Sequence, residues 1–397
     1  MNGHPTVLGD VANALVSHPE VACGTTIADV SRIVAFLELA GGATSAGTSP
    51  HAAARSPACT GPRPRSSPVD HAVGSLVTSR ARARARARLA FERARSFSVG
   101  AMTATSNLTA TSKTKTWIIT GASSGLGLAL AETALAAGEN VVGTARRADR
   151  FDGLEARYGE RFLAIEHDVR DTTGADVVVR RALEVFGRVD VLVNNAGAGQ
   201  VGAAEEITDA ALRDMLEQHL FGPAAYVRAV LPHMREGRSG AIVQMSSQGG
   251  RMSFPAVGSY SAGKFALEGW SEALAGEIAP FGIRVLIVEP SRFRTAFNAA
   301  DVLNTAQQSS VYEETIGAVR ANMAEADGIQ EGDPARAAQV IRDMLDTPDA
   351  PLRLPLGAEA VRNLTRVYRG ALDDVERWAS VSESADFPGV PPAVRAF

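Results

Sequence analysis

The sequence predicts an α/β fold in which helices cover both faces of a doubly wound parallel sheet. From residue 115 onward, short apolar runs rich in β-branched residues alternate with segments of helical periodicity. Strands that read as continuous apolar runs are buried on both faces, which is typical of a parallel sheet. A glycine-rich turn between the first apolar run and the first helix supports the same fold, because doubly wound sheets begin with such a turn.

The expected elements follow one another in the order that right-handed strand–helix–strand crossovers require. The polar segment 296–332 has only weak helical periodicity, and we expect it to form a mobile lid over a site. The expected strands are 117–120, 140–145, 162–166, 189–193, 241–245, 284–289 and 352–355, and the expected helices are 125–138, 173–186, 208–235 and 257–279.

Charge is distributed unevenly along the 397 residues. The net charge is −4, but residues 1–101 carry +5 and the remainder of the chain carries −9. The main body is therefore mildly acidic and lacks the basic footprint of a nucleic-acid-binding domain. Only the alternating Arg-Ala run Arg80–Arg88 has the charge to attract a nucleic acid.

The cysteines and the apolar stretches indicate a cytoplasmic protein. Both cysteines, Cys23 and Cys59, lie in the first 60 residues, so the main body has no disulfide framework and no thiolate metal site. No apolar stretch reaches the ~18 residues that a membrane span needs. The start of the chain also lacks the basic-then-apolar order of a secretory signal.

Residues 1–112 differ in composition from the rest, and we expect them to form a disordered extension. They are rich in Ala, Ser and Arg and hold too little apolar surface to offset the entropy of ordering. Three interpretations stay open: a transit peptide, a tether to nucleic acid or an anionic membrane, and a leader before a working protein that begins at Met102. The expected domain covers 113–383, and a proline-rich tail over 384–397 follows it.

The segment 120–127 reads Thr-Gly-Ala-Ser-Ser-Gly-Leu-Gly and joins the first strand to its helix. A pyrophosphate needs close backbone approach, free N–H groups and the positive end of a helix dipole, and glycine permits that approach. A plain tight turn is the alternative, but the position after the first strand favours a phosphate site. The expected binding residues are Gly121, Ser123, Ser124, Gly125, Leu126 and Gly127.

The end of the second strand favours NADP over NAD. In this architecture the adenosine ribose of a bound dinucleotide lies there, and an acidic side chain would accept hydrogen bonds from its hydroxyls. This sequence instead has Arg146 and Arg147, and an arginine can pair with a 2′-phosphate. NAD is the second choice, and two exposed arginines at the start of a helix are the alternative explanation.

Two further strand ends carry residues suited to the same ligand. Asp168, with Val169 beside it, can accept a hydrogen bond from an adenine amino group, although Asp is also a common helix N-cap. The fourth strand ends in Asn-Asn-Ala-Gly, where Asn195, Ala196 and Gly197 leave room for a flat ring and a ribose.

Tyr260 and Lys264 are the expected catalytic pair. Their i,i+4 spacing places them on one helix face, where an ammonium would stabilise a phenolate and lower the tyrosine pKa. Ser247 lies thirteen residues earlier, at the carboxyl end of the fifth strand, and its hydroxyl can hold a substrate oxygen. Hydride would pass directly between a nicotinamide and the substrate carbon, so no metal is needed.

The glycine loop, Asp168, the Asn-Asn-Ala-Gly turn, Ser247 and the Tyr–Lys pair together resemble the short-chain dehydrogenase/reductase family. The resemblance covers about 115–300 closely and continues loosely to about 365. It implies a Rossmann-type sheet of seven strands, NAD(P)-dependent oxidation of alcohols or reduction of carbonyls, and homodimers or homotetramers. It makes Tyr260 the general acid/base, Lys264 its partner and Ser247 the orienting hydroxyl. Pro290, Phe293 and Thr295 match positions near the nicotinamide carboxamide.

The chain departs from the family pattern at three positions. His219 stands where the family has an asparagine whose helix kink supports a proton relay, and we include it among the catalytic candidates. Gly263 stands where serine is common, and we expect little chemical effect from it. Ser291 replaces a glycine after Pro290, so the loop over the nicotinamide is expected to differ.

The substrate expected from these features is a small, hydrophobic carbonyl or alcohol. Apolar residues occupy the segments that would line its pocket: Val201, Met252, Phe254, Val257 and Phe297. The competing hypothesis is a non-catalytic NAD(P)-binding sensor or scaffold, but relatives of that kind lose the tyrosine or the lysine, and both are present here.

Overall fold

The computed structural model of the protein describes residues 114–299 and 302–393. The expected extension over 1–112, with the Arg80–Arg88 run and Met102, lies outside these residues, as do the last four residues of the tail.

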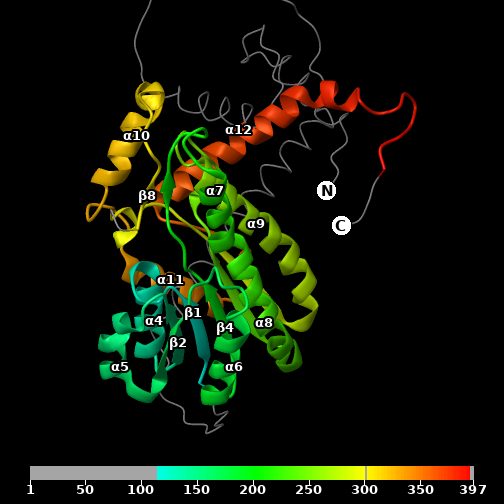
Figure 1. Cartoon of the computed structure of the whole chain (residues 1–397). Helices are drawn as coiled ribbons and strands as arrows, with labels where there is room; N and C mark the ends of the chain where they lie inside the picture. The colour runs from blue at the N-terminus through cyan, green and yellow to red at the C-terminus, as the bar shows by residue number, and fades with distance from the viewer. Residues whose placement is uncertain (1–113, 300–301, 394–397) are drawn as a thin grey trace, which may run out of the picture. The chain divides into compact units, whose positions relative to one another are not determined.

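Seven parallel strands form one sheet, which confirms the doubly wound Rossmann-type fold (Figure 1). Their order is β3-β2-β1-β4-β6-β7-β9. The chain runs outward from β1 to β3 and then returns to the other side of β1, so the direction of winding switches between β1 and β4. Such a switch opens a crevice at the carboxyl ends of the strands. The strands are β1 Thr116–Thr120, β2 Asn140–Ala145, β3 Phe162–Glu166, β4 Val191–Asn194, β6 Gly240–Met245, β7 Ile283–Pro290 and β9 Arg353–Leu356.

Helices cover both faces of the sheet, and each face has its own apolar core. One core packs α4, α5 and α11 against the strands, and the other packs α6, α8 and α9 against the opposite face. The described helices are α4 Gly125–Ala136, α5 Asp152–Tyr158, α6 Ala175–Phe186, α7 Asp209–Leu216, α8 Gly222–Gly237, α9 Gly258–Ile278, α10 Glu313–Glu325, α11 Pro334–Asp346 and α12 Ala358–Glu383.

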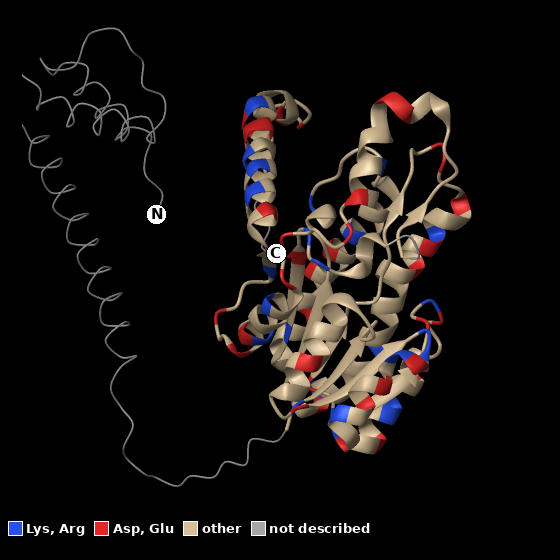
Figure 2. Ribbon diagram, turned by 90° about the vertical axis from the view of Figure 1, so that its left-hand side faces the viewer, with Lys and Arg blue, Asp and Glu red and all other residues tan. Residues whose placement is uncertain are grey.

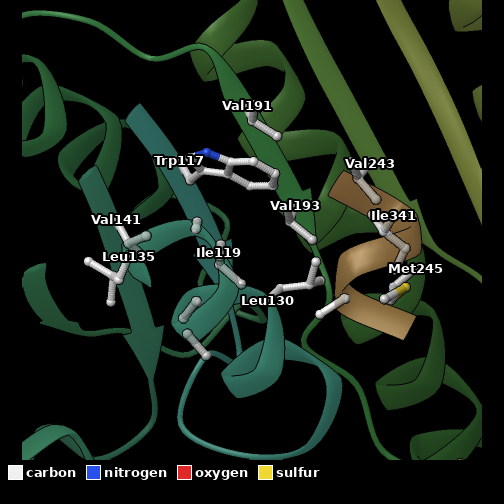
Figure 3. Packing of buried hydrophobic residues seen from close by; sticks show 14 of the residues in the cluster. Trp117, Ile119, Leu130, Leu135, Val141, Val191, Val193, Val243, Met245 and Ile341 are labelled. Atoms are coloured by element: carbon white, nitrogen blue, oxygen red, sulfur yellow. The ribbon is translucent and has the colours of Figure 1, made fainter. Parts of the chain in front are cut away.

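The alternation of side chains along β1 shows why the strands read as apolar runs. Trp117 and Ile119 point into the core beneath α4 (Figure 3). Ile118 instead belongs to the core beneath α6. All three are at most 1% exposed. Because successive side chains alternate between the two faces and both faces are covered, β1 reads as a nearly continuous apolar run, with a threonine at each end.

The structure differs from the sequence expectation mainly between the strands. The expected helix over 208–235 consists of α7, a π-helical turn at Glu217–Phe221 and α8. The segment 296–332 is not uniformly irregular, because it contains α10 and the short strand β8 Asn304–Thr305, which pairs with β5 Gln200–Val201. Helices α5, α11 and α12 were not predicted.

The described residues bear on two of the expectations, the absence of a membrane span and the absence of a basic footprint. None of the described helices combines the length and the apolar character that crossing a membrane requires. Lys and Arg are interspersed with Asp and Glu along the described elements rather than gathered on one of them (Figure 2).

Candidate active site

The carboxyl ends of β1, β2, β4, β6 and β7 open into one cavity of about 870 Å³. Nearly all the residues that the sequence predicts for the site line this cavity. Gly127 and Arg147 are the two predicted residues that do not line it. The predicted residues that line it are Gly121, Ser123, Ser124, Gly125, Leu126, Arg146, Asp168, Val169, Asn195, Ala196, Gly197, His219, Ser247, Tyr260, Lys264, Pro290, Phe293 and Thr295.

The glycine loop is held against the end of β4 by direct contacts. Gly121 has φ +64°, and a Cβ on it would lie 2.9 Å from the Cα of Ala196. The side-chain amide of Asn195 donates to the carbonyl oxygen of Thr120 at 2.9 Å. A Cβ on Gly127 would lie 2.4 Å from that same amide nitrogen, so Gly127 permits packing within the protein rather than ligand approach.

The start of α4 fits the pyrophosphate of a dinucleotide. No side chain caps this end of the helix, and its first turn carries no acidic residue. The first N–H groups of a helix lack intrahelical partners and carry a partial positive charge. Ser123, Ser124 and Gly125 line the cavity at this point, so hydroxyl and backbone donors face the position that a phosphate would take.

The two arginines after β2 have different surroundings. Arg146 is exposed, lines the cavity and has no ion-pair partner among the described residues. Arg147 lies outside the cavity and pairs with Asp149 at 3.1 Å. Only Arg146 is therefore free to meet a ligand phosphate.

Asp168 is paired within the protein. Arg170 forms a bidentate pair with its carboxylate and also contacts Asp214 at 3.0 Å. The hydrogen bond from Arg170 lowers the pKa of Asp168. Arg170 is a residue that the sequence pattern alone did not single out, because its role depends on a contact with α7, 44 residues away.

The catalytic candidates converge at the centre of the cavity. Lys264 is buried and donates to the carbonyl oxygen of Met245 at 2.7 Å, and its Nζ lies 5.8 Å from the centre of the Tyr260 ring. The Ser247 hydroxyl accepts from the N–H of Gly249 at 3.0 Å and hydrogen bonds to Tyr260. One face of α9 and the end of β6 thus place a hydroxyl, a phenol and an amine together.

Burial shifts the pKa values of Tyr260 and Lys264 in opposite directions. Loss of solvent raises the pKa of Tyr260 to about 12, although the hydrogen bond with Ser247 acts against the rise. The same loss of solvent lowers the pKa of Lys264 to about 7, against the opposing effect of Glu268. The expectation of a lowered tyrosine pKa is thus reversed here, because desolvation of the phenol dominates.

Known proteins resemble the chain over the sheet and the cavity. The family described as short chain dehydrogenase matches residues 115–305. Oxidoreductase BOA17 of Botryotinia fuckeliana is 36% identical over 267 residues, which cover 67% of this chain and 97% of that protein. The chain belongs to the short-chain dehydrogenase/reductase family.

Solved structures agree with this membership. A short-chain dehydrogenase from Streptomyces avermitilis is 48% identical with a TM-score of 0.65, over 70% of this chain and 100% of that one. A 3-ketoacyl-(acyl-carrier-protein) reductase from Brucella melitensis, solved with NADH, is 26% identical with a TM-score of 0.50, over 60% and 95% of the two chains. The chain is therefore an NAD(P)-binding dehydrogenase/reductase.

Two departures from the short-chain dehydrogenase/reductase pattern meet in one contact. His219 lies in the π-helical turn, is 1% exposed, and packs edge-on against Tyr260 with ring centres 5.4 Å apart. A Cβ on Gly263 would lie 2.9 Å from His219 Nδ1, and a Cβ on Gly197 would lie 2.7 Å from His219 Nε2. The expectation for Gly263 concerned its chemistry; its steric effect is clear, because the absent side chain makes room for the imidazole.

The His219 imidazole is neutral in these surroundings. Burial, together with the nearby Lys264, holds the pKa of His219 well below its usual range. Neither ring nitrogen hydrogen bonds to another described residue. The side chain therefore acts on Tyr260 through packing in this arrangement.

The third departure, Ser291, leaves the backbone unstrained. Ser291 does not have a positive φ, and its N–H donates to the carbonyl oxygen of Leu356 at 2.9 Å. The loop after β7 thereby continues the pairing of β7 with β9. The neighbouring Gly357 takes the positive φ, at +93°.

The end of the cavity nearest α10 is lined by apolar side chains together with the amides of Asn298, Asn304 and Asn322. Residues 296–299 and 302–332 supply part of the cavity wall, and α10 is tied to the loop after β5 by a buried ion pair between Arg320 and Glu206. That ion pair lowers the pKa of Glu206 to about 2. Val201, expected in the lining, is instead buried behind it. The apolar lining residues include Met252, Phe254, Val257, Phe297, Val302, Val319 and Met323.

A buried carboxyl pair lies behind the site. Glu268, one turn after Lys264, accepts from Ser246 at 2.6 Å and from Arg353 at 3.0 Å. Glu289 at the end of β7 is 0% exposed, with Arg353 Nε 3.8 Å away. Burial and the neighbouring Glu268 raise the pKa of Glu289 to about 7. Glu289 therefore carries a proton in mildly acidic solution.

Replacing Glu289 with Gln is expected to flatten the pH dependence of stability. An acid with a raised pKa binds its proton more tightly in the folded state, so wild-type stability falls as pH rises from about 5 toward 7. Gln mimics the protonated acid, and we expect the variant to be about 2 kcal/mol more stable than wild type at pH 8. Chemical denaturation between pH 5 and 8 measures this. Glu272→Gln, beside the same arginine but exposed, should keep the wild-type slope, and an unchanged slope in Glu289→Gln would contradict the assignment.

Proposed function

We propose that the chain is an NADP-dependent carbonyl reductase or alcohol dehydrogenase for apolar substrates, with Tyr260 as its general acid/base. The observation that carries this proposal is the position of the tyrosine. Tyr260 lines the same cavity as Arg146 and the glycine loop, and the apolar side chain of Phe297 packs against its ring with ring centres 5.8 Å apart.

The proposed chemistry assigns a role to each polar group. NADP(H) would accept or supply hydride at the substrate carbon. In the reductive direction, Tyr260 Oη gives its proton to the substrate oxygen, while the Ser247 hydroxyl hydrogen bonds to that oxygen. Lys264, held by the Met245 carbonyl, stabilises the phenolate that remains, and His219 restricts the tyrosine ring from one side.

The apolar wall supports a hydrophobic substrate. Aromatic and aliphatic side chains from the loop after β6 and from α10 surround the space beside Tyr260, and hydrophobic linings of this kind favour ligands with little polar surface. A small ketone or aldehyde with aliphatic or aromatic substituents is the proposed substrate class.

Arg146→Ala is expected to weaken NADPH binding about 10- to 100-fold and NADH binding less than about 3-fold. The reason is the loss of a charge-assisted contact with the 2′-phosphate, which NADH lacks. Fluorescence titration of both nucleotides measures the two affinities.

Arg147→Ala is the matched control, because this arginine is also exposed but pairs with Asp149 outside the cavity. It should leave both affinities near wild type. Equal losses for NADPH and NADH in Arg146→Ala, or a wild-type preference for NADH, would count against NADP as the cofactor.

A further inference from the structure

Helix α12 has an apolar face that nothing in the described chain covers. Its first turns are anchored, since Ala360 and Leu364 are buried and Arg251 donates to the Tyr368 hydroxyl at 2.8 Å. From Arg369 to Glu383, every residue except the partly buried Ala379 is exposed. Leu372, Val375 and Trp378 are 57%, 69% and 53% exposed. Figure 1 shows α12 extending away from the labelled strands β1, β2 and β4.

Val361, Tyr368, Leu372 and Val375 lie on a heptad seam, whereas the exposed Trp378 flanks the seam and Val381 lies off it. The seam lies along one side of α12 at intervals that alternate between four and three residues, the spacing at which one helix packs along another. Most helical stability in proteins comes from packing of an apolar face, so a partner on the outer half of α12 would stabilise it. The seam consists of Val361, Thr365, Tyr368, Leu372, Val375, Ala379 and Ser382.

The charges beside this seam indicate what the partner is. Arg362, Arg369, Glu376 and Glu383 recur every seven residues, each directly after a seam residue. None of the four forms an ion pair with another described residue. Two copies of α12 packed antiparallel about a point between residues 372 and 373 place Arg362 level with Glu383 and Arg369 level with Glu376. A parallel pair brings no arginine level with a glutamate.

We propose that α12 is a dimerisation helix, which packs antiparallel against α12 of a second copy of the chain. An antiparallel pair has twofold symmetry, so the same surface serves both copies and each arginine–glutamate match occurs twice. The helix lies outside the residues matched by the family model, 115–305.

Dimerisation through α12 would also support the cavity wall. Glu359 and Asn363 on the inner side of the helix line the cavity, and Asn363 donates to the side chain of Gln248 at 3.0 Å. Gln248 follows Ser247 directly. Asn363 and Gln248 thus connect α12 to Ser247, the proposed orienting hydroxyl. The proposed interface itself does not depend on the proposed chemistry.

Charge reversal on the full chain tests the proposal by sedimentation velocity over a concentration series. In Glu376→Arg/Glu383→Arg, all four flanking positions are arginine, and we expect the dimer dissociation constant to rise at least about 10-fold, so that the mass falls by half where wild type is associated. The variant Arg362→Glu/Arg369→Glu should dissociate to a similar extent. An equimolar mixture of these two variants should form a heterodimer. A variant that carries all four exchanges should self-associate like wild type.

Two seam variants separate the proposed interface from a general effect of charge. Leu372→Asp introduces a charge into the seam and should also halve the mass, whereas Ser380→Asp, on the polar side of the same helix, should not. Circular dichroism verifies that each variant is folded. A wild-type chain that is monomeric at about 100 μM, a mass unchanged by the reversals, or variants that do not associate when mixed would each overturn the proposal.

Discussion

Tyr260→Phe is expected to lower turnover about 10³-fold while leaving nucleotide affinity within about 3-fold of wild type. General acid–base catalysis contributes about 10²–10⁴ to rate, and the phenol oxygen is the group placed to exchange a proton with the substrate. Phenylalanine keeps the ring contacts with His219 and Phe297, so packing at the site is preserved. Single-turnover kinetics with NADPH and an apolar ketone measure the loss.

A control separates the loss of the proton donor from a general loss of a hydroxyl. Tyr158→Phe removes a phenol that lies at the end of α5, outside the main cavity, and should leave turnover unchanged. Comparable turnover in Tyr260→Phe and wild type would rule out the proposed role of Tyr260 and leave the fold assignment intact.

Gly263→Ala is expected to destabilise the protein by about 1–3 kcal/mol and to lower turnover about 10-fold. Alanine normally stabilises a helix interior relative to glycine. Here the added Cβ would lie 2.9 Å from His219 Nδ1 and 3.2 Å from the carbonyl oxygen of Met215, so either the imidazole or the helix must shift. His219 would move toward Tyr260 and misplace the phenol. Denaturation and steady-state kinetics measure the two effects.

Helix α9 offers its own controls for this prediction. Nothing lies within 4 Å of a Cβ built on Gly269 or Gly276, so alanine at either position should stabilise the protein by up to about 1 kcal/mol. Adding His219→Asn to Gly263→Ala removes the clashing ring and should restore turnover, with a coupling free energy of at least about 1 kcal/mol. Purely additive effects of the two substitutions would show that the glycine and the histidine are not a matched pair.

Local patterns in the sequence were sufficient to predict the strands and the site at their ends. The strands β2 and β3 begin and end at the predicted residues, because their apolar runs are bounded by polar or glycine residues. Most of the residues expected to bind a nucleotide or act in catalysis converge for a related reason: they follow the carboxyl ends of strands, which a parallel sheet brings together, or lie on helix α9 that packs beside those ends.

Contacts between distant segments could not be predicted in the same way. Gly263 was expected to have little chemical effect because it carries no side chain, and its close approach to His219, 44 residues earlier, cannot be read from a local pattern. Arg147 differs from Arg146 only in how its side chain is directed toward Asp149. Helix α12 was missed because most of its apolar seam faces away from the domain core rather than into it.

Transfer of deuterium from NADPH labelled at C4 of the nicotinamide tests the central claim most directly. We predict that the wild-type chain reduces at least one apolar ketone or aldehyde of a broad panel. Mass spectrometry should find one deuterium at the new carbinol carbon, and Tyr260→Phe should form almost none of that product. Tight NADPH binding with no labelled alcohol from any member of the panel, and no oxidation of the matching alcohols with NADP, would contradict the claim and indicate a nucleotide-binding scaffold or sensor.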